Sequence, residues 1–480
     1  MKLDKHHYFY LFAGFLFLGI VSIKLLSDGM FLDGLLYADI SRNMAQGIGS
    51  FWKPHLSNCL FSEFYEHPPL AFGLQSLGFR LFGDSIYVER IYSLFTFIVV
   101  GYLIVLIWGK LTDDLKNGWI PLIFWIVVNN VTWAATNNML ENTMSIFVCL
   151  SMLCYLNSFD TKPIIWVILS GLSLTLALLT KGPFCLYIWG VPFFMWIFLR
   201  KKNFLQMIID SLILIACTLI PIVLLYVFIP DAQYNIQHYL DYQVMGSIKS
   251  VVTVNSRFTI IGKFLENIIT SLIIGIIVIV VGRKKAVDKH LFIENKNTAL
   301  MLIVTVLSGV LPIMVSMKQR DFYILTVYPF FAIAWAYYLY PLIKLGIDRI
   351  SLESKGFKIF KRICFGIIII SIVITISRIN KVSRDFQIIH DTKAVISIVG
   401  KNNTINICPS MFTYWSLHGY FSRYGNVSLE ANETNKCKYY LSNNDCNKEI
   451  LTENYDLVPI KTMDYKLYCL KNSKISAKSK

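Results

Sequence analysis

Side chains suited to group transfer from a phosphate lie in the turns between apolar segments. The loop between the first two of these segments has few bases (Arg42, Lys53 and Arg80), and its acids include Asp28, Asp33, Asp39, Glu63 and Glu66. A carboxylate can deprotonate an incoming hydroxyl, and cations can stabilise a phosphate as negative charge grows on it. The candidate set for this chemistry is Asp33, Glu66, His67, Glu141, Lys181, His238, Lys318 and Arg320.

The distribution of basic residues predicts which side of a membrane these side chains face. Three clusters fall in alternate short loops: 200–202, 283–285 with Lys289, and the six bases between Lys344 and Arg362. That alternation is typical of cytoplasmic loops. It places the 28–84 loop, the 230–262 loop, the turn at Lys318 and the chain after Ile379 outside. The whole candidate set therefore reaches one outer face, whereas randomly scattered charges would divide between two.

The composition predicts a polytopic membrane protein. Of the 480 residues, 55% are hydrophobic and only 16% charged, too apolar for a soluble globule. The net charge of +15 could suggest a nucleic-acid partner, but its placement in alternate loops argues against one. We expect an all-α membrane protein of about 11–13 helices. The apolar segments run at about 8–27, 86–108, 118–134, 139–157, 163–180, 183–199, 204–229, 263–282, 298–316, 322–343 and 363–378.

Two domains are expected. Residues 1–378 would form the membrane domain, with the 28–84 loop carrying the active site. After 378 the composition turns polar, and alternating apolar residues predict a small α/β domain at 379–480 outside the membrane. Its four cysteines permit two disulfides in three pairings (Cys408, Cys437, Cys446 and Cys469).

The residues after Asp33 predict an amphipathic helix on the outer surface. Leu36, Tyr37 and Ile40 recur at helical spacing, and Gly47 is placed to end the helix. Asp33 would stand at its start, where the purely structural interpretation is an N-cap.

Motifs at the two ends of this loop resemble a known family. Asp33 precedes Tyr37-Ala38, and Glu66-His67 precedes Pro-Pro-Leu, followed by Leu-Phe-Gly at 81–83 and Glu-Arg at 89–90. This order resembles the first outer loop of polyprenyl-phosphate-sugar-dependent C-type membrane glycosyltransferases. The similarity is greatest to the bacterial aminoarabinose lipid A transferase and protein O-mannosyltransferase group, over roughly 25–345. One departure is His67, where the family usually has lysine.

The resemblance implies a reaction and roles for the candidate residues. A sugar would pass, with inversion, from a polyprenyl (undecaprenyl) phosphate to a lipid A, glycan or protein acceptor at the outer face of the inner membrane. Asp33 would act as base or position the acceptor, and Glu141 would assist. Lys181, in a Lys-Gly-Pro motif, would grip the donor phosphate with Lys318 and Arg320. Tyr37 and Tyr323 would contact substrate, and Glu66 and His67 would shape the donor pocket.

Other interpretations remain open from the sequence. Lys181 could be an end residue whose amine reaches the membrane surface, Glu141 could belong to a structural ion pair, and His238 could be a surface histidine. Alternatively, Glu66 and His238 would bind a divalent metal as a cofactor. A multispan lipid or sugar transporter or flippase is the rival function, but its charges should lie near the membrane midplane and its halves should repeat.

Overall fold

A computed structural model describes residues 4–283, 296–432, 434–443, 446 and 453–471. The chain forms two compact units. Unit 1 comprises Met1–Leu26, Tyr65–Ala71 and Arg90–Arg378; unit 2 comprises Ser27–Phe64, Phe72–Glu89 and Ile379–Lys480. Two segments of the early loop thus belong to the same unit as the polar C-terminal residues. Of the basic clusters, Lys284, Lys285 and Lys289 lie outside the described residues.

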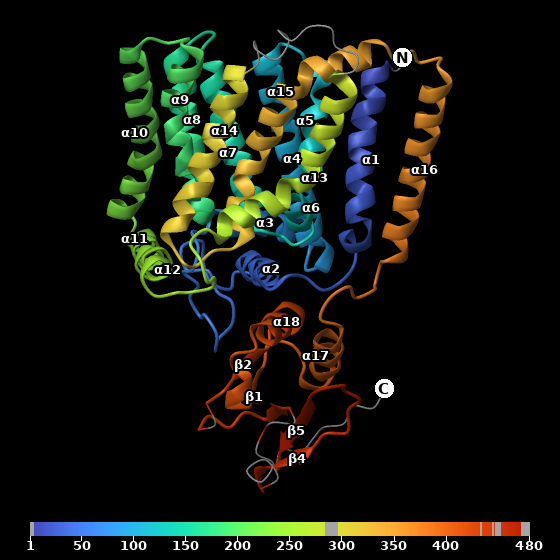
Figure 1. Cartoon of the computed structure of the whole chain (residues 1–480). Helices are drawn as coiled ribbons and strands as arrows, with labels where there is room; N and C mark the ends of the chain where they lie inside the picture. The colour runs from blue at the N-terminus through green and yellow to red at the C-terminus, as the bar shows by residue number, and fades with distance from the viewer. Residues whose placement is uncertain (1–3, 284–295, 433, 444–445, 447–452, 472–480) are drawn as a thin grey trace. The chain divides into compact units, whose positions relative to one another are not determined.

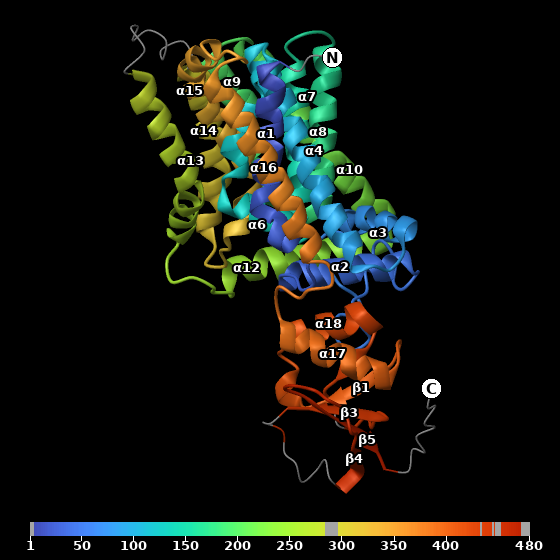
Figure 2. The ribbon, with the colours of Figure 1, turned by 90° about the vertical axis from the view of Figure 1, so that its right-hand side faces the viewer.

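Unit 1 is helical, and its long helices run side by side (Figures 1 and 2). The long helices are α1 (Lys5–Leu25), α4 (Ile86–Thr112), α7 (Leu140–Asn157), α8 (Pro163–Lys181), α10 (Phe204–Phe228), α13 (Thr259–Arg283), α14 (Lys296–Val310), α15 (Tyr328–Asp348) and α16 (Lys355–Ser377). The short helices are α5 (Trp119–Ile126), α6 (Asn129–Ala135), α9 (Val191–Leu199), α11 (Pro230–His238) and α12 (Gly246–Lys249). Single-turn and 3₁₀ or π segments complete the unit: η1 (Leu115–Asn117), η2 (Pro183–Gly190), η3 (Tyr239–Met245), η5 (Leu311–Val315) and η6 (Asp321–Val327).

By length and composition, eight helices of the described residues can cross a membrane, or nine if the bent pair 115–126 and 129–135 is one span. The protein is therefore a multi-pass membrane protein, with fewer qualifying helices than the 11–13 expected. Three predicted spans account for the difference. One is that pair, bent by 89°, one is the short apolar stretch 183–199, and one is α7. Helix α7 is buried along most of its length and carries polar residues such as Glu141 and Asn142, which lower its hydropathy.

Unit 2 contains the predicted α/β structure. Its five-stranded sheet has the order β2-β1-β3-β5-β4, from β1 (Thr404–Ile407), β2 (Ser428–Glu430), β3 (Tyr439–Ser442), β4 (Tyr455–Leu457) and β5 (Lys466–Leu470). Strand β1 pairs parallel to β2 and β3, whereas β5 pairs antiparallel to β3 and β4. Helices α17 (Phe386–Val399) and α18 (Trp415–Gly425) contribute Val395, Leu417 and Phe421 to a buried core with the strands.

The early loop contains α2 (Leu32–Ala45) and leads into α3 (Leu70–Phe82). The helix predicted after Asp33 is present, but Asp33 lies in its first turn and Phe31 is the N-cap, so the N-cap interpretation is wrong. The polar side of α2 is also not exposed to solvent, because Asp39, Ser41 and Arg42 are all buried. Helix α2 is therefore a packed element of unit 2 and not a surface helix.

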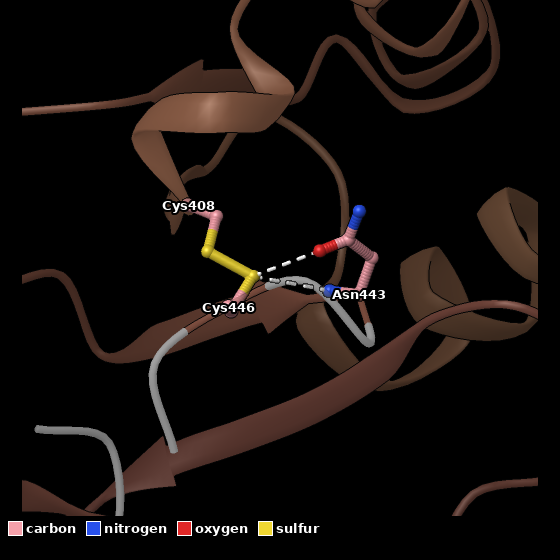
Figure 3. Close-up of a disulfide and its surroundings, with 3 residues drawn as sticks. All are labelled: Cys408, Asn443 and Cys446. Carbon is pink, nitrogen blue, oxygen red and sulfur yellow. Dashed lines mark hydrogen bonds between the residues drawn. A yellow bond between two sulfur atoms is a disulfide. The ribbon is translucent and has the colours of Figure 1, made fainter. Parts of the chain in front are cut away.

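One disulfide links two of the four C-terminal cysteines. Cys408, after β1, is bonded to Cys446, and the Sγ of Cys446 lies 3.3 Å from the backbone nitrogen of Asn443 and 3.0 Å from its Oδ1 (Figure 3). Neither Cys437 nor Cys469 is bonded to another described cysteine. This selects one bridge among the pairings that the sequence permits.

Candidate active site

Lys181 is placed by the way helix α8 ends. Gly182 follows as the C-cap with a positive φ of 86°, and its N–H donates to the carbonyl of Leu178 at 2.8 Å. Pro183 cannot continue the helical hydrogen bonding and begins η2. The Lys-Gly-Pro motif thus stops the helix directly after the lysine. A cation at this end of a helix is favoured by the helix dipole.

The Lys181 amine is buried beside a carboxylate and two aromatic rings. Its Nζ lies 2.5 Å from Oε1 of Glu141, in the first turn of α7, and both side chains are almost fully buried. The same Nζ lies 5.3 Å and 5.8 Å from the ring centroids of Phe322 and Tyr323. The ion pair that the sequence left open therefore exists. Breaking such a pair leaves an uncompensated charge in an apolar surrounding.

His67 stands on the short segment that belongs to unit 1, Tyr65–Ala71. Burial, with the positive charges of Lys181 and Lys318, holds the pKa of the His67 imidazole well below its usual value. The side chain is accordingly neutral near pH 7. His67 cannot supply the positive charge that a lysine would bring to this position.

Lys318 approaches from the turn between η5 and η6. Its Nζ donates to Oε1 of Gln243 at 2.9 Å, which joins the turn to the π-helical segment η3. Gln319 anchors the turn, because its side-chain amide donates to the carbonyls of Arg257 and Ser316, both at 2.9 Å.

These side chains meet at a cavity of about 480 Å³ within unit 1. Its polar lining includes Lys181, Lys318 and His67, and the hydroxyl and amide groups of Tyr239, Tyr323 and Gln243. Most of the remaining lining is apolar. The apolar lining comes from η2, η3, α12 and η5 and includes Phe184, Leu186, Val244, Ile248, Pro312 and Ile313. A space of this kind suits an amphiphilic anion.

Four predicted site residues thus share one cavity: His67, Lys181, Lys318 and Tyr323. Glu141 reaches the site through its pair with Lys181. Arg320 is exposed at the start of η6 and is not among the lining residues, and neither is the half-buried Glu66. The ring of His238 stacks on Tyr242 with centroids 4.2 Å apart, and Tyr65 lies 5.1 Å away.

Asp33 and Tyr37 belong to unit 2, so their relation to the cavity stays a prediction. Asp33 is half-buried, and Tyr37 is buried against the ring of Phe72. In the part of the chain that the structure describes, no three His, Cys, Asp or Glu side chains are grouped to hold a metal ion. A metal role for Glu66 and His238 also stays a prediction.

Sequence reasoning missed Tyr239 and Gln243 as lining residues. Tyr239 donates a hydrogen bond to the carbonyl of Lys181 at 3.1 Å, and Gln243 accepts one from Lys318. Their four-residue spacing within the outer loop 230–262 was the available signal. It was weak, because the loop is expected to be irregular and its π-helical turn is not encoded by any simple pattern. Such turns are frequent at functional sites.

Comparison with known proteins agrees with the fold. The family model described as dolichyl-phosphate-mannose-protein mannosyltransferase matches residues 66–226. ArnT from Cupriavidus metallidurans in the apo state is similar with a TM-score of 0.62 at 12% identity, over 94% of this chain and 95% of that chain. The same protein bound to undecaprenyl phosphate gives 0.66 at 13% identity, over 98% and 99%. A search of curated proteins gives no match.

These similarities define the class. The chain has the fold of the C-type membrane glycosyltransferases, so the resemblance indicated by its loop motifs is confirmed. ArnT shares this fold with the chain over nearly the whole length of both.

Proposed function

We propose that the protein transfers a sugar from a polyprenyl phosphate, such as undecaprenyl phosphate, to an acceptor hydroxyl. The observation that carries the proposal is the cavity lined by two lysines and by many apolar side chains. A lipid phosphate likewise combines charge with hydrocarbon. The ArnT structure with undecaprenyl phosphate supports this choice of donor.

The charges at the cavity suit a sugar phosphodiester. Glu141 balances Lys181, and His67 is neutral, so Lys318 supplies the net positive charge. A lipid-linked sugar phosphodiester carries one negative charge. When its bond to the sugar breaks, a second negative charge develops on the released phosphate, and both lysines are close enough to the cavity to stabilise it.

The proposed reaction is a single displacement. Asp33 takes the proton from the acceptor hydroxyl, and the hydroxyl oxygen forms a bond to the anomeric carbon. The bond from that carbon to the phosphate oxygen breaks, and its electron pair stays on the polyprenyl phosphate. Lys181 and Lys318 hold this leaving group. Glu141 holds the Lys181 amine in place, and the ring of Tyr323 covers that amine. Tyr37 contributes to substrate binding beside Asp33.

We place the active site and residues 379–480 outside the cytoplasmic membrane. The basic loops support this orientation. An activated sugar already joined to a lipid also fits a chain in which we find no nucleotide-binding motif. The acceptor we propose is lipid A, a glycan or a protein of the cell envelope, and the transferred sugar a hexose or pentose.

The test is turnover of labelled polyprenyl-phosphate sugars by the purified, membrane-reconstituted chain. Lys318→Ala and Asp33→Asn should each lower kcat by about 10²-fold or more, because each removes a group needed in the transition state. Lys358→Ala, at an exposed pair with Glu353, is the matched control and should leave turnover unchanged. A flippase would move the donor across the bilayer without releasing polyprenyl phosphate. Release at the wild-type rate by both variants would remove the assignment.

Gly182→Ala should disturb the same cavity by changing the backbone conformation at the end of α8. At φ 86° and ψ −150° any side chain is disfavoured by about 1–3 kcal/mol, and the added Cβ would overlap the phenol of Tyr239. We expect Lys181 and Tyr239 to move apart and the donor KM to rise at least about tenfold, a loss of about 1.4 kcal/mol in binding. Gly346→Ala, whose Cβ would meet nothing within 4 Å, is the control. An unchanged KM in Gly182→Ala would show that the close contact at this helix end is not needed.

A further inference from the structure

Helix α18 packs closely on the helix that carries Asp33. A Cβ on Gly419 would lie 2.8 Å from Cδ2 of Leu35 and 3.2 Å from Cδ2 of Leu36. With a side chain at 419, these leucine side chains or the two helices would have to shift. Leu35 and Leu36 follow Asp33 by two and three residues in α2. Glycine at 419 thus sets how near α18 stands to the start of α2.

The far end of α2 is held by the next residues of α18. An Nη of Arg42 pairs with Asp39 and donates to the carbonyl of Ser422 at 2.7 Å. Arg42 and Asp39 are buried, and the serine hydroxyl donates to the carbonyl of Leu56 at 2.9 Å. Nine residues separate Asp33 from Arg42, a distance of roughly 13 Å along a helix. Contacts at both ends prevent α2 from sliding or turning on its axis.

Two further side chains of α18 form hydrogen bonds with chain segments next to α2. The hydroxyl of Tyr420 accepts from the backbone N–H of Met30 at 3.3 Å and donates to Asp385 at 2.9 Å. The guanidinium of Arg423 donates to Asp84 at 2.6 Å and to Glu89, in the first turn of α4, at 3.1 and 3.2 Å. Residues 419–423 of one short helix therefore contact the segment before α2, both its ends and the start of α4.

The chemistry of these contacts suits orienting one helix on another better than it suits adding stability alone. Arg42 and Arg423 are each about 3% exposed and face three carboxylates. Burying charges in this way is costly, and apolar residues of similar size often stabilise a fold as well or better. What buried charge pairs provide in addition is direction, because the donors of arginine must align with particular oxygens.

We propose that α18 is the positioning element for α2, and that Gly419 and Tyr420 are positioning residues that set the place of Asp33 for the reaction. This inference rests on the proposed function only in assigning Asp33 its chemical role. It gives residues 379–480 a part in catalysis without contact to the substrate.

The test compares two glycines of the same helix in the full-length, reconstituted protein. Gly419→Ala should lower kcat about tenfold or more with little change in the donor KM, because misplacing a reacting group by a fraction of an ångström slows the chemical step. Gly425→Ala is the matched control. Its Cβ would also be crowded, at 2.9 Å, but against Ile396 of α17 and not against α2. It should leave kcat within about twofold of wild type, since distant overpacking is independent of the site.

A compensating change and a second variant separate positioning from misfolding. Leu35→Ala removes the methyl groups that the new Cβ meets, so we expect it to restore part of kcat in the Gly419→Ala background. Tyr420→Phe adds no volume and removes the hydroxyl that accepts from Met30. Hydrogen exchange of the amides 32–45 should be faster in Gly419→Ala and Tyr420→Phe and unchanged in Gly425→Ala.

The exchange measurement does not depend on any substrate. If the wild type releases no polyprenyl phosphate from any donor, the proposed function fails, while the exchange of α2 still reports whether α18 holds it. Unchanged exchange in both Gly419→Ala and Tyr420→Phe would overturn the inference, even for an active enzyme. Faster exchange with wild-type kcat would equally overturn it, because α2 would then be held without effect on the reaction.

Discussion

Lys181→Met should abolish sugar transfer and also destabilise unit 1. The substitution removes a cation from the cavity and leaves Glu141 buried without its lysine. Loss of transition-state stabilisation should lower kcat/KM by about 10²–10³-fold. The uncompensated carboxylate should cost a further 3–5 kcal/mol, roughly, of folding free energy. The measurements are polyprenyl phosphate release and thermal unfolding in the same detergent.

The double variant Lys181→Met with Glu141→Gln separates these two effects. It removes both charges together, so most of the lost stability should return. Activity should not return, since the cavity still lacks its second cation. Conversely, recovery of turnover in the double variant would mean that Lys181 matters only as the partner of Glu141. The structural interpretation of the pair would then be sufficient.

Arg423→Met should loosen unit 2. The arginine is buried and is the hydrogen-bond donor for Glu89 and Asp84. Its loss leaves Glu89 buried without that partner, which should cost about 3–5 kcal/mol. Because each 1.4 kcal/mol corresponds to a factor of ten, the opening of α18 should rise by about 10²–10³-fold or more. Hydrogen exchange of the α18 amides measures this opening directly.

Arg384→Met is the control for that experiment. Arg384 is an arginine of the same unit, paired with Asp385 at 3.4 Å, but its side chain is half exposed. An exposed pair contributes less than about 1 kcal/mol, so exchange in α18 should change little. Equal effects of the two substitutions would show that the buried network around Arg423 adds nothing beyond a surface pair.

Much of the fold was predictable because the signals are local. Apolar runs identify helices one by one, and Lys-Gly-Pro marks the end of α8 at Lys181 from three adjacent residues. Alternating apolar residues after 378 predicted a small α/β region, and the strands β1 to β5 all lie there. The count of membrane-crossing helices was less predictable. Whether α7 faces lipid or other helices depends on its neighbours, which its own residues do not reveal.

The site was predictable only in part. His67, Lys181, Lys318 and Tyr323 were all expected, because they stand in or beside motifs that resemble those of a known family. Arg320 was expected with them but lies exposed outside the cavity lining. Lys318 and Arg320 stand two residues apart in one turn, and sequence alone does not say which of them turns inward.

The amino-acid sequence by itself determined that this is a helical membrane protein with a small polar α/β region, and that its candidate site residues stand at or between the ends of apolar segments. Hydrophobicity and local backbone preference suffice for that. Only the tertiary structure decided that Lys181 pairs with Glu141, forty residues away, and that Gln243 contacts Lys318. It also decided that α2 packs against α18 and is not a surface helix. The physical reason is that partners of buried charges are chosen by how whole helices pack, a property distributed over hundreds of residues.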